Sequence, residues 1–302
     1  MAACFVALLL LAWPLARLAQ EVPADSHAPP RNLPPTNDPK EIVRRALDAD
    51  QNGFHLARNY TFERREELKV LDRKGAPKKH ETNTFDVTIL YDEPYSRRIR
   101  KDDKPLTDKE QKKEAERLDK LVAERQNESD AEHKRRLAKQ EKNREEERAF
   151  VRDIINAYDF RIVGDDRVDG HDTYVVDANP RPDFHPTQPH ADILPKLRGK
   201  IWISKSDFGC VKLEAETLDT ISWGLFLLRI HKGTQFRLNQ VHVNDEIWLP
   251  SRMSLSANAR LGLFVNDSLN WESTYSNYKK FTSGSRILPG AAMVSPPAGS
   301  AR

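Results

Sequence analysis

Five aspartates and one histidine gather in the segment IVGDDRVDGHDTYVVD, residues 162–177. They are Asp165, Asp166, Asp169, Asp172, Asp177 and His171. Carboxylates and an imidazole at this density could bind a metal ion or transfer protons. A calcium loop would need Asp or Asn at position 167 and Glu at position 176, where the chain has Arg167 and Val176. Asp169-Gly170 is a strong hairpin-turn signal. We therefore predict strands at 160–163 and 173–176, joined by a polar turn region at 164–172.

A second polar segment, PRPDFHPTQPHAD at 180–192, holds four side chains that could bind zinc: Asp183, His185, His190 and Asp192. The two histidines do not have helical i,i+4 spacing, and the prolines exclude a helix. We predict an irregular loop without a metal. A metal-dependent hydrolase at this loop remains a third hypothesis.

Other signals of catalysis are missing from the sequence. It has no G-x-S-x-G elbow, H-E-x-x-H pair, phosphate-binding loop or dinucleotide fingerprint. Cys210 alternates with Val211 and Leu213 on an expected strand, which favours a small buried hydrophobe over a nucleophile. We therefore predict a protein that is not an enzyme and that uses no cofactor.

The N-terminal residues have the character of an export signal. Residues 2–16 are apolar over a length typical of a secretory h-region, and Val22-Pro23-Ala24 supplies small residues for cleavage after Ala24. We predict a signal peptide at 1–24 and a periplasmic protein. A disordered proline-rich linker at 25–37, one domain at 38–288 and a disordered tail at 289–302 would follow. Cys210 would then be the single cysteine of the mature chain, which excludes an internal disulfide.

The segment 107–157 is dominated by charged residues. Thr107-x-x-Glu110 and Ser129-x-x-Glu132 both have the capping-box pattern, so we predict helices at 108–126 and 130–157. Residues 107–150 hold thirteen Lys or Arg against thirteen Asp or Glu. This balance favours a charged surface helical hairpin over a phosphate-binding arm, and we expect no nucleic-acid partner.

The rest of the domain alternates polar and apolar residues with period two. A capped helix is expected at 39–51, ended by Asn52-Gly53, and strands at 59–71, 84–92 and 95–102 precede the charged segment. Further alternating segments bring the total to about eleven antiparallel strands, and a sheet of that size curls or closes. The expected class is α+β, mainly antiparallel β.

Large apolar residues on these strands are candidates for a ligand cavity. A curved sheet with one main helix over it can leave a pocket suited to apolar ligands. Plain core packing is the alternative for any single residue. The candidates are Phe62, Phe85, Ile89, Trp202, Trp223, Phe226, Trp248, Phe264 and Trp271.

Several phrases resemble LolA/LolB-like proteins of the outer-membrane lipoprotein-sorting type. They are YDFRIVGDDRVDGHDTYVVDANP, LRGKIWISKSDFGCVKLEAE, DEIWLPSRM and YSNYKKF, and the resemblance spans about residues 38–282. It implies an incomplete, half-open β-barrel around a helical lid, with an apolar cavity for acyl chains. The charged hairpin is long for such a carrier, and no arginine of this chain matches the one that such carriers use in lid closing.

Two hypotheses follow from the sequence. The first is a non-enzymatic periplasmic or cell-envelope carrier for lipid or lipoprotein acyl chains, with an envelope membrane complex as a further partner. The alternative is a structural or protein-interaction module of the cell envelope that uses the charged helical hairpin as its partner surface.

Overall fold

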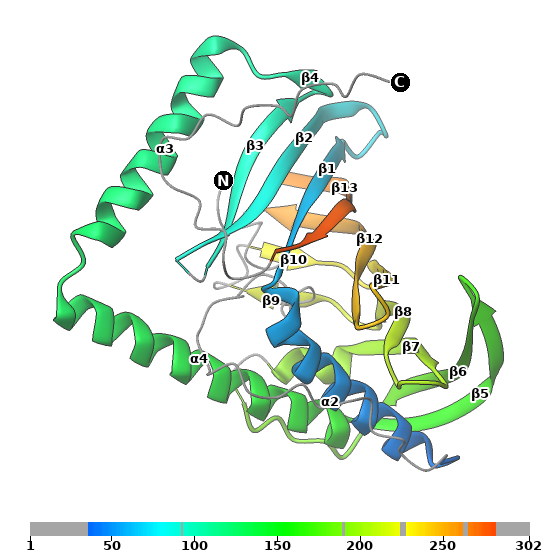
Figure 1. Ribbon diagram of the computed structural model, residues 1–302. Helices are drawn as coiled ribbons and strands as arrows, with labels where there is room; N and C mark the ends of the chain where they lie inside the picture. Colours follow the sequence, from blue (N-terminus) through cyan, green and yellow to red (C-terminus); the bar gives the residue numbers. More distant parts are fainter. Residues whose placement is uncertain (1–35, 92, 189–190, 224–227, 262–264, 282–302) are drawn as a thin grey trace, which may run out of the picture.

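A single antiparallel sheet of thirteen strands forms most of the structure. The computed structural model describes residues 36–91, 93–188, 191–223, 228–261 and 265–281 (Figure 1). The strands are β1 Tyr60–Leu71, β2 Pro77–Leu90, β3 Glu93–Lys101, β4 Lys104–Pro105, β5 Tyr158–Val168, β6 His171–Pro180, β7 Leu197–Ser204, β8 Cys210–Thr217, β9 Ile221–Trp223, β10 Leu228–Ile230, β11 Gln235–Val243, β12 Ile247–Leu261 and β13 Val265–Lys280.

The sheet is open, with β4 at one edge and β5 at the other. Its order is β4-β3-β2-β1-β13-β12-β11-β8-β7-β6-β5, and β9 and β10 form a side hairpin on β12. The expected incomplete barrel and mainly antiparallel class are confirmed. There are more strands than the expected eleven or so. One extra strand is the very short β4, and the segment 222–232, expected as one strand, contributes to both β9 and β10.

Within the residues that the structure describes, four helical segments accompany the sheet: α2 Pro39–Ala57, α3 Asp108–Gln126, α4 Asp130–Ala157 and the 3₁₀ helix η2 Ala191–Lys196. In the chain, α3 and α4 connect β4 to β5, so they link the two open edges of the sheet. We call α3 and α4 together the strap. Figure 1 shows them diverging from their link as two arms instead of running back along each other.

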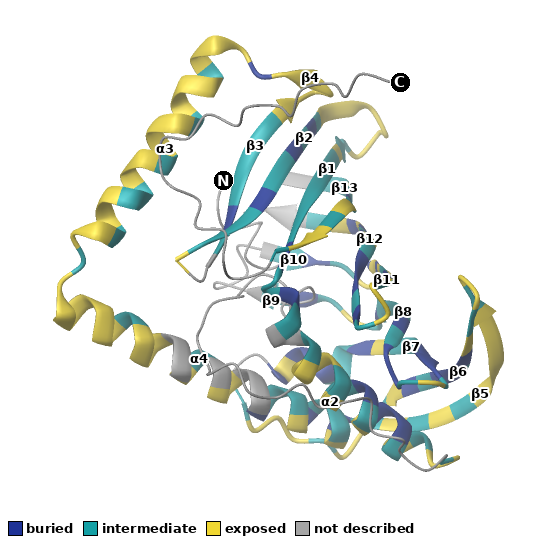
Figure 2. Cartoon of the chain, in the orientation of Figure 1, coloured by how far each residue is buried: buried dark blue, intermediate teal, exposed yellow. Residues whose placement is uncertain are grey.

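The strap begins each helix with the capping box expected from the sequence. Thr107 and Ser129 accept hydrogen bonds from the backbone N–H groups of Glu110 and Glu132, and each glutamate side chain caps in return. Among the described residues, α3 has no buried side chain. Figure 2 shows the strap as largely exposed. Its charged composition explains this, because unpaired charges are costly to bury.

Helix α2 continues past the point where the sequence indicated its end. Asn52-Gly53 was expected to end it, but the helix runs to Ala57. Gly53 faces Ile247, and Ala57 is buried with Tyr60 and Leu249. Burial of this last turn against the sheet offsets the low helix propensity of glycine, which is about 1 kcal/mol.

The acidic segment 162–177 forms the β5–β6 hairpin. Asp169 and Gly170 have φ of 49° and 87°, as a two-residue hairpin turn requires, so the predicted turn is confirmed. The strands reach Val168 and His171, so they are longer than expected and most of the aspartates lie on strands. Asp166 accepts a hydrogen bond from Trp202 Nε1 at 3.0 Å, which uses one carboxylate for structure.

The sheet has two distinct faces. Ile42, Val43 and Ala46 of α2 pack against Val176 and Ile203 in one buried cluster. We call this side of the sheet the inner face, and the opposite side the outer face.

Candidate functional site

An apolar row of side chains crosses the inner face. Residues directly opposite each other on paired strands point to the same side, so register traces the row from the α2 contact outward. It runs Val176–Ile201–Leu213–Leu238–Met253 across β6, β7, β8, β11 and β12. Five neighbouring strands therefore present apolar side chains to one side.

A second row lies beside the first. It runs Ala178–Gly199–Ala215–Phe236–Leu255–Trp271 and reaches β13. Phe236, Met253 and Leu255 belong to one buried cluster, against which Leu213, Leu238 and Leu269 pack. We call these two rows, with Ala257 and Leu269, the floor.

Asp50 of α2 lies at the α2 end of the floor. It follows Val43 and Ala46 at helical spacing, so it lies on the stripe that faces the sheet. Part of Asp50 is exposed to solvent. The protein around its carboxyl group nevertheless removes water from it, which raises the pKa of Asp50 to about 6. The protein around Asp50 therefore favours the neutral form of its carboxyl.

Cys210 of β8 lies close enough to Asp50 to interact with its charge. Burial of the thiol, and secondly the charge of Asp50, raise its pKa to about 12. The thiol therefore stays protonated at neutral pH, a state unsuited to nucleophilic attack. This agrees with the structural role expected for Cys210.

Four of the nine predicted cavity residues lie on the inner face. Phe85 pairs with Arg64 in register, and Arg64 pairs with Tyr275, a neighbour of the floor. Ile89 shares the face of Phe85 by strand alternation. Phe62 contacts Tyr275 with ring centroids 5.8 Å apart, and Trp271 is part of the floor itself.

Two further predicted residues, Trp202 and Trp248, lie away from the floor. Trp202 pairs with Val175, which neighbours the inner residue Val176, and therefore lies on the outer face. Trp248 packs in the same outer cluster as Trp202 and donates from Nε1 to Asp207 at 2.9 Å. The side chains of Trp223, Phe226 and Phe264 lie outside the described residues.

The cavity residues predicted from the sequence do not include four central floor residues: Phe236, Leu238, Met253 and Leu255. Their signal is present as strict alternation in QFRLNQ and RMSLSANA. Leu238, Met253 and Leu255 are smaller than the predicted aromatic residues, whereas Phe236 has the same side chain as the predicted Phe62 and Phe85. Period-two alternation alone would have placed them on one face of two neighbouring strands.

The strap is attached to the body near its two ends. At the β3 edge, Glu114 accepts from the backbone N–H of Arg98 at 3.4 Å, and Arg117 donates to the carbonyl of Ser96. These contacts pair backbone groups of the exposed sheet edge. At the other end, the buried Asp153 of α4 accepts three hydrogen bonds from Thr187 and Gln188.

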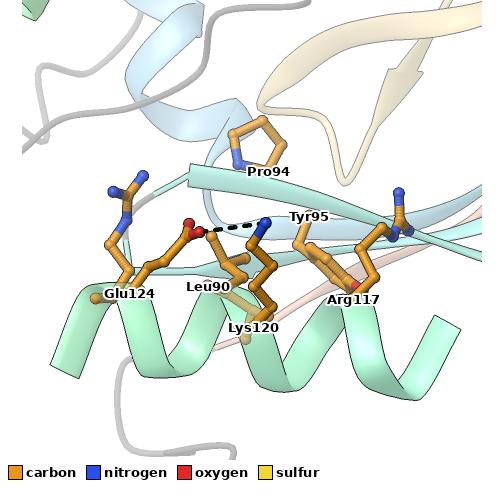
Figure 3. A pocket seen from close by; sticks show the side chains of 8 residues that line it. Leu90, Pro94, Tyr95, Arg117, Lys120 and Glu124 are labelled. Atoms are coloured by element: carbon orange, nitrogen blue, oxygen red, sulfur yellow. Dashed lines mark ion pairs between the residues drawn. The ribbon is translucent and has the colours of Figure 1, made fainter. Parts of the chain in front are cut away.

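A cavity of about 390 Å³ lies between α3 and the β2–β3 turn. Figure 3 shows Leu90, Pro94 and Tyr95 on the strand side, facing Arg117, Lys120 and Glu124 of the helix. Lys120 and Glu124 are more than half exposed and stand 3.9 Å apart. Movable charged side chains thus form one wall, and this cavity is a less defined ligand site than the floor.

The polar segments show no arrangement typical of a metal site. Within the described residues, no three His, Cys, Asp or Glu side chains are grouped to hold an ion. Asp183 pairs with Arg181 at 2.9 Å, His185 is exposed, and His190 lies outside the described residues. His171 packs edge-on against the ring of Trp248, with ring centroids 4.7 Å apart.

Comparisons with known proteins give matches to solved structures only. No family model and no curated protein matches the sequence. The chain is similar in structure to LolA-superfamily proteins. One from Nitrosomonas europaea is 10% identical, with 81% of this chain and 94% of that chain covered and a TM-score of 0.27.

Two further matches have comparable scores. A DUF1329 family protein from Desulfovibrio piger is 12% identical, covering 83% of this chain and 96% of that chain, with a TM-score of 0.32. The MucA/MucB complex of Pseudomonas aeruginosa gives 11% identity, 82% and 100% coverage and a TM-score of 0.22. The contacts of this chain itself therefore carry the functional argument.

No helix in the described residues combines the length and apolarity that crossing a membrane requires.

Proposed function

We propose that this chain is a non-enzymatic binding protein of the cell envelope that holds acyl chains of a lipid or lipoprotein against the floor. The observation that carries the proposal is the continuous apolar surface from β6 to β13, traced by cross-strand register. An acyl chain needs a long apolar surface and little polar recognition. Each buried CH₂ contributes about 0.8 kcal/mol, so one chain of ordinary length supplies enough binding free energy.

The strap fits the role of a cover over such a ligand. It joins the two open edges of the sheet, and within the described part of α3 no side chain is buried. Its attachments lie near β3 and near the C-terminal end of α4. The part between them can move away from the sheet without exposing a buried core, which gives a ligand a route to the floor.

Location in the cell envelope rests on the predicted signal peptide at residues 1–24. An envelope protein that shelters acyl chains between membranes would need this export. A partner membrane complex would deliver or receive the ligand, and the balanced charges of the strap provide a polar surface for such a contact.

Lipid analysis of the purified protein tests the proposal. The full chain is expressed with its N-terminal segment, purified without detergent, and its organic extract is examined by mass spectrometry. We expect acyl lipids in near-stoichiometric amount. A protein that carries no lipid and also fails to bind the neutral apolar dye N-phenyl-1-naphthylamine would contradict the proposal.

A second candidate function is a protein-interaction module that uses the strap. It is favoured by the exposure of α3 and by Leu137 of α4, an apolar side chain that is 38% exposed. Deleting residues 108–157 would remove Ile154 and Ala157, which pack in a buried cluster. Charge reversal at the exposed Lys112 and Lys113 is the cleaner test, because a carrier should keep its dye binding while an interaction module should lose its partner.

A further inference from the structure

The floor changes from apolar to polar at β13. The first row continues from Met253 to Ser273, then to Glu66 and Asn83. The second continues from Trp271 through Leu68 to Glu81. Along these two rows the inner face is therefore apolar from β6 to β12 and carries the polar residues Glu66, Glu81 and Asn83 on β1 and β2, with β13 as the boundary.

Two enclosed hydrogen-bond donors lie at this boundary. Within the described part of the chain, Trp271 Nε1 and Ser273 Oγ are shielded from solvent and make no hydrogen bond of regular geometry, although the Tyr275 hydroxyl lies within interaction distance of Ser273. The hydroxyl of Tyr275, two residues further along, donates to Met253 Sδ at 3.1 Å. Unpaired buried polar groups are rare because each costs about 1–3 kcal/mol, so two of them on one face of one strand need an explanation.

The charges next to these donors are already balanced. Arg64 Nε lies 3.1 Å from Glu66 Oε1, and both side chains are mostly buried. Burial raises the pKa of Glu66, partly offset by Arg64, and the charge of Glu81 raises it further. A second carboxylate here would meet the charges of Glu66 and Glu81, and Arg64 already pairs with Glu66. An uncharged acceptor avoids that repulsion.

We propose that Trp271 and Ser273 donate hydrogen bonds to the carbonyl oxygen of a neutral acyl ester whose hydrocarbon chain lies on the apolar part of the floor. This inference rests on the proposed function and specifies the ligand's polar group and its orientation. A carbonyl oxygen has two lone pairs and accepts from both donors at once. The ester would lie at β13, the chain would extend toward β8, and the rest of the headgroup would extend toward β2.

The side chains beside the two donors allow a ligand to reach them. Ser273 is flanked in register by Glu66, which pairs with Arg64, and both have long unbranched side chains. The Arg64 guanidinium lies over the Phe85 ring at 5.1 Å. Rotation of such side chains is fast and requires no change in the sheet.

Competition against a bound dye tests the inference. N-phenyl-1-naphthylamine is bound to the full-length protein and displaced by methyl laurate, by laurate or by tridecane. The three have similar chain lengths and differ in their polar group. We expect methyl laurate to displace the dye at about three- to tenfold lower concentration than tridecane, as one or two net hydrogen bonds would give. Laurate should compete less well than its ester.

Two variants remove the donors one at a time. Ser273→Ala deletes only a hydroxyl, and Trp271→Phe keeps an aromatic ring while losing the N–H. Each should reduce the preference for methyl laurate over tridecane by about threefold and leave displacement by tridecane unchanged. A purely structural role would instead shift both competitors together.

The failures of the two proposals are distinguishable. If tridecane and methyl laurate compete equally in the original chain, or if both variants keep the full preference for the ester, the carbonyl site is wrong while the floor still binds acyl chains. If the dye does not bind, or no competitor displaces it, the proposed function fails as well.

Discussion

Asp50 of α2 is an acidic residue whose ionisation the fold disfavours. Its pKa in the folded protein, about 6, lies above the ordinary value of 3.8. Between those two pH values the folded state binds more protons than the unfolded state, so stability falls as pH rises through this range. The charged carboxylate is therefore a cost to the fold at neutral pH.

The substitution Asp50→Asn should remove this pH dependence. At pH 7 we expect the variant to be more stable than the original chain by about 1 kcal/mol, a value reduced for the solvent exposure of the carboxyl. At pH 4 the two should differ little, because Asp50 is then mostly neutral. Urea unfolding at both pH values measures the difference, and a variant whose stability tracks the original from pH 4 to pH 7 would show that the carboxyl is fully solvated.

Residue types alone predicted only part of the site. Ile201, Trp202 and Ile203 are all apolar, so alternation could not tell which face of β7 is inward, and Trp202 proved to be outside. A β-bulge between Trp202 and Ile203 adds to the ambiguity. By contrast, the calcium-loop pattern fails at Arg167 and Val176, and the segment 162–177 forms a strand hairpin, as predicted.

At the scale of elements, local signals with a defined geometry were predicted well. The Asp169-Gly170 turn and both capping boxes are formed as expected, because each depends on a few neighbouring residues. The length of α2 was underestimated because its last turn is stabilised by contacts with β12, about two hundred residues away in sequence. The capping boxes define where the two strap helices begin but not the angle between them, so the divergence of α3 and α4 (Figure 1) could not be predicted.

The packing of the β7–β8 turn against Trp248 gives a prediction at this scale. A Cβ atom added at Gly209 would overlap the indole ring of Trp248, whose Nε1 donates to Asp207. Gly209→Ala should therefore destabilise the protein by about 1–3 kcal/mol. At Gly199 of β7, a new Cβ would meet Glu214 O at 3.5 Å and Ala178 Cβ at 3.9 Å, both ordinary contacts.

Gly199→Ala is the matched control for this substitution. Both variants add one methyl group near the same strand, so chemical unfolding should show a clear loss for Gly209→Ala and little change for Gly199→Ala. Equal stability of the two variants would mean that the Trp248 ring can move freely and does not fix the turn.

At the scale of the whole molecule, the chain places its first and last long strands side by side and leaves two edges open. The strap connects those edges, and α2 packs on the inner face at one end. This arrangement keeps one large apolar surface on the inside of a curved sheet without closing it. Alternation predicted an approximate number of strands and a sheet that curves. It could not predict the pairing of β1 with β13, because that pairing depends on contacts across the full length of the chain.

The most direct test of the central claim compares adjacent residues on opposite faces of β13. Leu269 packs against the floor cluster, and Asn270 is exposed on the other face. Leu269→Arg places a charge on the floor, whereas Asn270→Arg adds the same side chain to the outer surface. Circular dichroism checks that both are folded, and Leu269→Gln serves as a milder floor variant.

The measurement is the affinity of each folded protein for N-phenyl-1-naphthylamine, followed by displacement with methyl laurate. Binding on the floor predicts a loss of about tenfold or more for Leu269→Arg, a smaller loss for Leu269→Gln and less than about twofold change for Asn270→Arg. Equal affinities for the Leu269 and Asn270 variants would contradict the account and show that acyl chains bind elsewhere or not at all.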